Sequence, residues 1–273
     1  MPRALDHIVI PSRDLDAQAD LFRRLGFQVG ARNRHPWGTV NHIVQFDGVF
    51  LELISLGEGF EAPAPEPKEF SFAAEVARFL ESREGLAMVV MRSNDAEADR
   101  REFVRTGLGD FSRFYFGREG RRPNGEVVTV AFSLAFAASP AFPSTSFFVC
   151  QQHYPENFWS RAAQIHPNGA LGVAGVRFEH PRPWEAMDFL GKFFAAPADG
   201  KGAGYVFGLE EAVVAELREG PAPSLTALEI RVADIRAAER WLRGGGVAFT
   251  AREGRLEVAA GEAMGVELAY IGA

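Results

Sequence analysis

Residues Leu5–Ile10 read L-D-H-I-V-I, an apolar run with the pattern of a β-strand that carries one histidine, His7. A helical pattern follows, and after it the run F-L-E-L-I at Phe50–Ile54 carries one glutamate, Glu52. Apolar residues recur every second position in a half-buried strand and about every 3.6 positions in a helix, so the order of elements can be read from their spacing. The stretch predicts a β-α-β-β-β unit with a histidine on its first strand and a glutamate on its last.

Local signals set the boundaries of this unit. Ser12 or Asp14 can cap the helix, because a side-chain oxygen at that position accepts a hydrogen bond from an otherwise unpaired N–H group. The helix is predicted to run to about Leu25 and to end at Gly26, a residue type that often terminates helices. Three strands are expected after it, at Phe27–Arg32, Val40–Phe46 and Val49–Ser55.

The same order of elements recurs along the chain. Three further strands that could each open such a unit are predicted at Leu86–Met91, Ala170–Glu179 and Leu225–Val232. Each is followed by a predicted helix, at Ala96–Thr106, Trp184–Phe194 and Ile235–Leu242 respectively. Asn94 is the expected cap of the first of these helices and Asp234 that of the last. We therefore expect residues 1–152 to form a first pair of units around a cleft, residues 153–170 to cross over, and residues 171–273 to form a second, degenerate pair.

Composition restricts the class of protein. The 273 residues are 47% hydrophobic and 24% charged, which is typical of a globular protein. A net charge of −7 argues against a nucleic-acid surface, and no apolar run reaches the ~18 residues that span a bilayer, so neither nucleic acid nor membrane is expected as a partner. The single cysteine, Cys150, excludes an internal disulfide, and the chain enters its first strand without a signal-like segment; both favour the cytoplasm. The 24 phenylalanines are expected to fill the core and to line an apolar pocket.

The run L-D-H-I-V-I, the helix, G-T-V-N-H-I-V-Q-F and F-L-E-L-I together resemble the vicinal-oxygen-chelate superfamily, which includes glyoxalase I and the extradiol dioxygenases. Within it the chain is most similar to bacterial glyoxalase-like domain proteins, which carry runs like Gln151–Ala170. The resemblance implies an α+β fold of tandem βαβββ modules whose curled mixed sheets enclose a cleft. In active members it also implies a divalent metal in that cleft, which chelates two neighbouring oxygens of a small-molecule substrate.

The resemblance places His7 and Glu52 at two metal-ligand positions, suited to Fe, Zn, Mn or Ni. The alternative is a hydrogen-bonded core histidine and a glutamate that points to solvent. The partner module departs from the family pattern, because Met88 aligns with His7, and Val149–Gln151 aligns with Glu52 without offering a carboxylate. His153, just past that strand, is the best replacement as third ligand, and such a trio would leave positions for water and substrate.

Further residues are candidates for the lining of the cleft. His42 is a candidate proton shuttle, or else a strand histidine that donates to a neighbour. Gln151 and Trp159 are candidates for the substrate pocket, and His166 either closes over the cleft or orders the turn beside it. His35 lies in a turn and is expected to face solvent.

Two functions remain open at this point. The first is a metal-dependent lyase, isomerase or dioxygenase that acts on a small molecule with vicinal oxygens and uses the metal as Lewis acid. Its metal ligands would be His7, Glu52 and His153, and its catalytic groups Glu52 and His42. The second is a metal-free protein that sequesters a small molecule, as bleomycin-resistance proteins do, and it is consistent with Met88 and the many phenylalanines. A homodimer is a candidate assembly, and the sequence does not identify the substrate.

Overall fold

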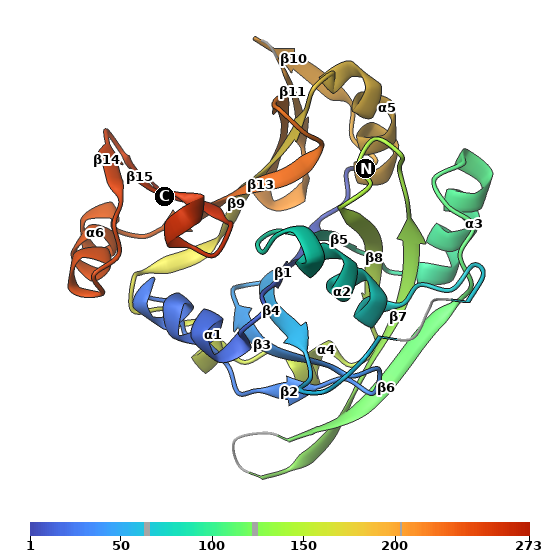
Figure 1. Ribbon diagram of the computed structural model, residues 1–273, viewed down its shortest axis with the longest axis horizontal. Helices are drawn as coiled ribbons and strands as arrows, with labels where there is room; N and C mark the ends of the chain where they lie inside the picture. Colours follow the sequence, from blue (N-terminus) through green and yellow to red (C-terminus); the bar gives the residue numbers. More distant parts are fainter. Residues whose placement is uncertain (63–65, 122–124, 203) are drawn as a thin grey trace.

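The computed structural model describes residues 1–62, 66–121, 125–202 and 204–273. The described chain forms two eight-stranded sheets that follow each other in sequence, the first built from β1–β8 and the second from β9–β16 (Figure 1). The strand order is β2-β3-β4-β1-β5-β8-β7-β6 in the first sheet and β10-β11-β12-β9-β13-β16-β15-β14 in the second. The two orders are equivalent, strand for strand, so each sheet consists of two β-α-β-β-β modules joined through their first strands.

In the first sheet, the first module contains β1 (Leu5–Pro11), α1 (Leu15–Arg24), β2 (Asn33–Arg34), β3 (Thr39–Gln45) and β4 (Phe50–Leu56). Helix α2 (Phe72–Ser82) leads to the second module, which contains β5 (Met88–Arg92), α3 (Ala96–Thr106), β6 (Phe114–Arg121), β7 (Val127–Ala137) and β8 (Ser146–Gln152). The crossover to the second sheet contains α4 (Pro155–Phe158) and the 3-10 turn η1 (Arg161–Gln164).

In the second sheet, the third module contains β9 (Ala170–His180), α5 (Pro183–Phe194), β10 (Ala198–Lys201), β11 (Gly204–Gly208), the 3-10 turn η2 (Glu210–Ala212) and β12 (Val214–Glu219). The fourth contains β13 (Ser224–Val232), α6 (Ile235–Gly244), β14 (Thr250–Arg252), β15 (Arg255–Val258), the 3-10 turn η3 (Ala260–Glu262) and β16 (Glu267–Gly272). The α+β fold of tandem βαβββ modules that the sequence predicts is the fold observed.

Helix capping follows the sequence signals with one correction. The Asp14 side chain accepts from the N–H of Ala17 at the start of α1, and Asp234 caps α6 in a similar way. Helix α3 is capped by Asp95 rather than by Asn94, and it ends at Gly107 in the left-handed conformation (φ 74°). A carboxylate at the cap also favours the positive end of the helix dipole, which gives Asp95 an advantage over its neutral neighbour.

Two strand predictions differ from the structure. Residues 27–32 form no strand, and β2 is confined to Asn33–Arg34, because Phe27 turns into the core against Phe22 and Phe46 instead of joining the sheet edge. The third module, whose later strands are hard to delimit from sequence, contains a tight hairpin of β10 and β11 that turns at Gly202 (φ 61°). Gly200 and Gly204 lie in these two paired strands, and Gly202 lies between them.

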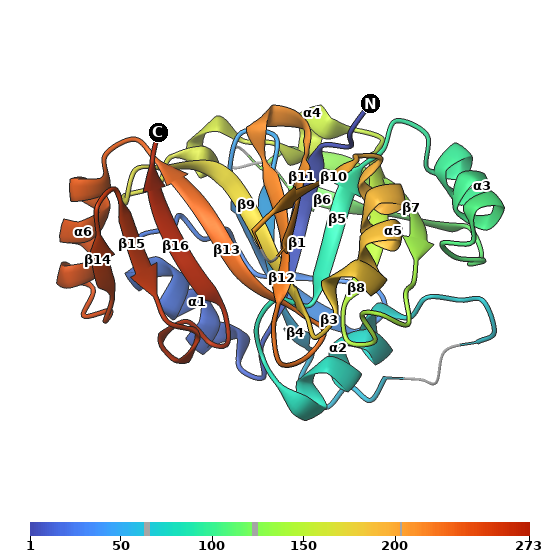
Figure 2. The same cartoon turned by 90° about the horizontal axis from the view of Figure 1, so that it is seen from above.

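The two sheets share one core through their back faces. Along β1, Ile8 and Ile10 point into this core, whereas His7 and Val9 point to the opposite, concave face of the first sheet. Figure 2 shows the two sheets lying one over the other, with α1 and α6 at one end and α3 and α5 at the other. Phe147 of β8 contacts Phe178 of the second sheet and Phe189 and Phe193 of α5, at ring-centroid distances of 6.0, 4.9 and 5.2 Å.

The first sheet curls until its two edges approach each other. Strands β2 and β6 are the outermost strands in the order, yet Trp37, just after β2, packs edge-on against Phe116 of β6 with ring centroids 4.8 Å apart. His35 contacts the same phenylalanine at 6.0 Å. The concave face is thereby enclosed on several sides, which is the geometry a small-molecule site requires. None of the described helices is long and apolar enough to cross a membrane.

Candidate functional site

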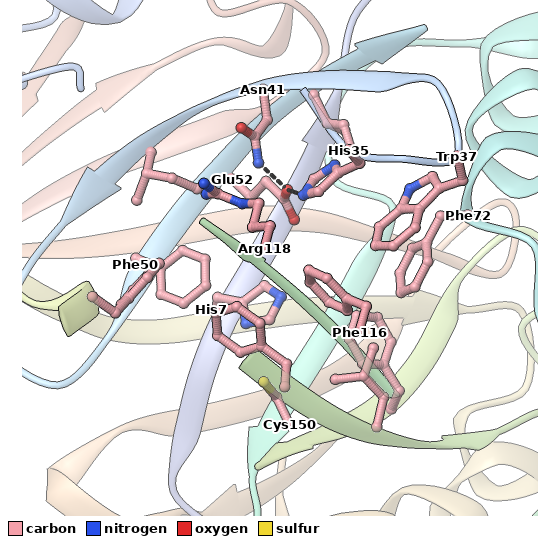
Figure 3. A pocket seen from close by; sticks show the side chains of 16 residues that line it. His7, His35, Trp37, Asn41, Phe50, Glu52, Phe72, Phe116, Arg118 and Cys150 are labelled. Carbon is pink, nitrogen blue, oxygen red and sulfur yellow. Dashed lines mark hydrogen bonds and ion pairs between the residues drawn. The ribbon is translucent and has the colours of Figure 1, made fainter. Parts of the chain in front are cut away.

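The concave face of the first sheet holds a pocket that is lined mostly by aromatic side chains (Figure 3). Its free volume is about 60 Å³, which leaves no room for a polymer. Strands β1, β3, β4, β6, β7 and β8 contribute to its wall, together with the turn before β3 and residues from α2 and α4. The lining residues are His7, His35, Trp37, Asn41, Ile43, Phe50, Glu52, Ile54, Phe72, Phe116, Arg118, Phe132, Leu134, Phe148, Cys150 and Phe158.

Stacked rings form the apolar part of this wall. His7 stacks on Phe50 with centroids 4.2 Å apart, Trp37 stacks on Phe72 at 5.3 Å, and Phe116 stacks on Phe132 at 5.1 Å. Ring pairs of this kind hold flat surfaces in fixed orientations at little cost in side-chain entropy. The pocket therefore presents a rigid apolar surface to a flat ligand.

His7 reaches the pocket through an irregularity in β1. The pairing of β1 with β5 shifts register between Leu5 and His7, a bulge that turns the neighbouring Asp6 toward His7. The Nδ1–H of His7 donates to Asp6 Oδ1 at 2.6 Å, and Gln152 Nε2 donates to Asp6 Oδ2 at 3.0 Å. Asp6 is fully buried, so these donors hold its carboxylate and fix the His7 ring in one orientation.

Glu52 lies in a polar corner of the same pocket. Asn41 Nδ2, on the neighbouring strand β3, donates to Glu52 Oε1 at 2.5 Å, and His35 Nε2 lies 3.8 Å from the same oxygen. Arg118 of β6 adds a positive charge whose field acts on the carboxylate. Burial lowers the pKa of the Arg118 guanidinium, and the nearby Glu52 carboxylate partly offsets this by raising it. Burial likewise lowers the pKa of His35 below 6.5, although Glu52 acts to raise it.

Three buried polar atoms of the pocket wall have no hydrogen-bond partner within the part of the chain that the structure describes. They are the indole Nε1 of Trp37, the amide Oδ1 of Asn41 and the guanidinium Nε of Arg118. Two of these atoms are donors and one is an acceptor. Buried polar groups are almost always paired, so unpaired ones in a pocket point to groups that a ligand or bound water satisfies.

Cys150 also lines the pocket but is chemically quiet. Its thiol is fully buried, and burial together with the nearby Asp6 and Glu52 carboxylates raises its pKa well above 9.0. A thiol held in its neutral form is a poor nucleophile. The residue therefore contributes to the apolar surface of the pocket.

The predicted ligands His7 and Glu52 both line the pocket, but the predicted third ligand, His153, does not. His153 is exposed, and its Nε2 is hydrogen-bonded to Ser133 Oγ at 2.8 Å, just beyond the end of β8. The trio proposed from the sequence is therefore not brought together. The physical reason is strand alternation: the His153 N–H still bonds to the Ala131 carbonyl of β7, and its side chain lies with Ser133 on the face opposite Phe132 and Leu134, which line the pocket.

The other predicted lining residues lie behind the wall rather than in it. His42 points to the opposite face of β3 from Asn41, and its Nδ1–H donates to the carbonyl of Gly30 at 2.7 Å. Gln151 accepts from the N–H of Ala96 at the start of α3. Strand alternation explains both departures, because each is one residue out of phase with the pocket face.

Trp159 and His166 support the pocket from outside. Trp159 packs against Phe50 and Phe158, two lining residues, at centroid distances of 5.9 and 5.0 Å. His166 accepts from the N–H of Gln28 through Nδ1 and donates to the carbonyl of Gln45 through Nε2, so it orders the crossover. Of the two interpretations of His166, the structure shows the ordering one.

Four polar lining residues are missed by the sequence prediction: His35, Trp37, Asn41 and Arg118. His35 is only 9% exposed and its Nδ1 is hydrogen-bonded to Thr39 Oγ1 at 2.8 Å, so its expected solvent-facing position is wrong. Asn41 could have been found from the hairpin of β3 and β4, where Ile43 pairs with Glu52, since alternation then puts Asn41 on the face of Glu52. Trp37 and Arg118 carry no comparable local signal.

The second module offers apolar residues where a metal centre would need ligands. In the first module, His7 of β1 pairs with Phe50 of β4, and Glu52 lies two residues after Phe50. In the second module, Met88 of β5 pairs with Ser146 of β8, so the residue that corresponds to Glu52 is Phe148, two residues after Ser146. Both Met88 and Phe148 are buried in the apolar cluster beside the pocket. In the described ranges, no group of three His, Cys, Asp or Glu side chains is placed to hold a metal ion. The donor set does not fit the metal centre that the resemblance implies.

The concave face of the second sheet is lined by ion pairs instead of aromatic rings. Glu267 of β16 pairs with Arg177 of β9, and Arg255 of β15 pairs with Glu229 and Glu257 at 2.6 and 2.9 Å. These charged groups satisfy one another across the strands. The two halves of the chain share a topology but present chemically different concave faces.

Paired βαβββ modules, a curled mixed sheet and a pocket on its concave face define the fold of the vicinal-oxygen-chelate superfamily. The sequence model of the glyoxalase-like domain family matches residues 5–194, which is most of the chain. The protein belongs to this family of glyoxalase-like domain proteins.

Solved structures agree on the fold. A hypothetical protein from Staphylococcus aureus matches with a TM-score of 0.72 at 12% identity, covering 99% of both chains. A mutant of 4-hydroxymandelate synthase from Streptomyces coelicolor matches with a TM-score of 0.62 at 14% identity, covering 99% of this chain and 92% of that one. A fusion of a xylose isomerase-like TIM barrel with 4-hydroxyphenylpyruvate dioxygenase matches at 0.62 and 12% identity, over 100% of this chain and 49% of the fusion. None of the curated proteins matches the chain in sequence.

Proposed function

We propose that this protein binds a small, flat, largely apolar molecule in the pocket of its first sheet, without a metal held by the protein. The observation that carries the proposal is the wall of stacked aromatic rings around a single polar corner. Apolar pockets with a few convergent polar groups are the usual form of small-molecule sites. A metal-free site also agrees with the second module, where the apolar residues Met88 and Phe148 take the positions that His7 and Glu52 hold in the first.

A metal-dependent enzyme of the glyoxalase and dioxygenase kind is the second candidate. One observation favours it: His7 and Glu52 lie on adjacent strands and line the same pocket. A divalent metal there would supply Lewis-acid chemistry to substrate oxygens. Against it stand the lack of a third ligand in the described residues and the engagement of Glu52 by Asn41.

Two measurements test the proposal. Metal analysis of protein purified without chelators is expected to give well under one equivalent of Fe, Zn, Mn or Ni; one equivalent that disappears in a His7→Ala variant supports the metal-dependent candidate instead. Toluene, a small apolar probe, is expected to bind and to lose affinity in Ile43→Trp, which fills the pocket from its wall. The matched control is Ile165→Trp, because Ile165 is exposed. Equal toluene binding by both variants would contradict the proposed site.

A further inference from the structure

We infer that the ligand of this pocket is an uncharged aromatic compound whose polar head joins a hydrogen-bond acceptor to a donor, as an aromatic amide does. The inference rests on the proposed function, because it names the class of molecule that the same pocket takes. It starts from the polar corner, where Asn41 and Arg118 lie beside Glu52 (Figure 3).

The unpaired atoms of this corner define what the head group must offer. Arg118 Nε is a buried donor and Asn41 Oδ1 is a buried acceptor, and neither has a partner among the described residues. Asn41 cannot supply its own missing partner by turning over, because its Nδ2 is already engaged with Glu52 Oε1. A ligand that fully satisfies the corner therefore accepts hydrogen bonds and also donates one.

Charge at the corner disfavours an ionised ligand. An anion offers acceptors only, so it would leave Asn41 Oδ1 unpaired and would lie beside the Glu52 carboxylate. A cation offers donors only, so it would leave the Nε–H of Arg118 unpaired and would lie beside the guanidinium. Glu52 and Arg118 already balance each other in charge, and an additional charge in a poorly solvated pocket is costly. An uncharged head with both functions avoids each of these penalties.

The rings around the corner define the body of the ligand. Trp37 lies between His35, stacked on it at 4.6 Å, and Phe72, stacked at 5.3 Å, and Phe116 meets it edge-on. Phe116 and Arg118 are two residues apart on β6 and both line the pocket, so the apolar wall continues directly into the polar corner. A flat ring bearing one short polar group matches this succession from apolar to polar surface.

Four probes that share one phenyl ring test the inference: toluene, benzamide, benzoate and benzylamine, each titrated against the whole chain by calorimetry or ligand-detected NMR at neutral pH. Benzamide is expected to bind most tightly, and toluene to bind more weakly by about fivefold or more for the hydrogen bonds it cannot make. Benzoate or benzylamine binding as tightly as benzamide would overturn the inference. Equal binding of toluene and benzamide would overturn it while leaving the proposed function intact, whereas no binding of any probe, toluene included, would contradict the proposed function as well.

Two conservative variants assign the effect to unpaired donors of the pocket wall. Arg118→Lys keeps the positive charge but removes the Nε donor of the corner, and Trp37→Phe keeps a ring but removes the indole N–H beyond His35. Each is expected to reduce the preference for benzamide over toluene, taken as the ratio of the two affinities in the same variant, by a few fold. Because toluene reports whether the pocket is still formed, a folding defect is recognised as a loss of both ligands. An unchanged preference in both variants would contradict the assignment.

Discussion

Asn41 donates a hydrogen bond to Glu52 from the neighbouring strand, and both side chains face the pocket of the first sheet. The bond gives the glutamate a partner in a place where its side chain is only 12% exposed. Asn41 pairs with Ile54 in the ladder and Ile43 with Glu52, so the bond runs diagonally between the strands. It explains how a carboxylate is accommodated between the apolar residues Leu51 and Leu53 of that strand.

Replacement of Asn41 by alanine is expected to destabilise the protein by roughly 1–3 kcal/mol, because the half-enclosed carboxylate of Glu52 loses its donor. The free energy of unfolding in urea measures the effect. Asn33→Ala is the control, since the Asn33 amide bonds only to the nearby carbonyl of Ala31 in an exposed position. Equal losses in the two variants would show that the bond to Glu52 contributes nothing specific.

The pair formed by Asp6 and His7 gives a second prediction. Asp6→Ala is expected to cost roughly 2–4 kcal/mol, because the buried donors His7 Nδ1 and Gln152 Nε2 both lose their acceptor. Asp20→Ala serves as comparison: Asp20 pairs with Arg23 on the exposed face of α1, where such pairs contribute little. Chemical denaturation of the two variants decides, and a negligible effect of Asp6→Ala would be evidence against the buried pair.

Phe147 connects the two sheets and provides a third prediction. Its ring is fully buried between β8, the second sheet and α5, so Phe147→Ala is expected to cost about 3–5 kcal/mol. The shared core also predicts that both halves unfold in one transition, so that unfolding curves measured by fluorescence and by circular dichroism coincide. Tyr115→Ala, at a side chain that is 57% exposed, is expected to change little. Separate transitions for the two halves would mean that the shared core is not cooperative.

Acid is expected to destabilise the fold through its buried histidines. Burial lowers the pKa of His166 and of His35 below 6.5, so below about pH 6.5 the unfolded chain binds more protons than the folded one. The free energy of unfolding therefore falls as the pH decreases from 7.5 to 5.5. His166→Gln is expected to flatten this dependence. Identical slopes for the unmodified protein and for His166→Gln would contradict the role of His166.

The sequence alone determined the modules. Alternating apolar residues, caps such as Asp14 and Asp234, and terminating glycines are signals between neighbours along the chain, and such signals specify helices and strands before any tertiary contact forms. His7 and Glu52 were found in this way, because a polar residue inside an apolar strand stands out against its neighbours.

Only the tertiary structure decided what surrounds these two residues. His42 and Gln151 fell one position out of phase with the pocket face, and a shift of one residue moves a side chain through the sheet. Trp37 and Arg118 lie far apart in sequence, at opposite edges of the first sheet, and come to one pocket because that sheet curls. The curl depends on strand twist and on packing summed over eight strands, a long-range property that no local pattern contains.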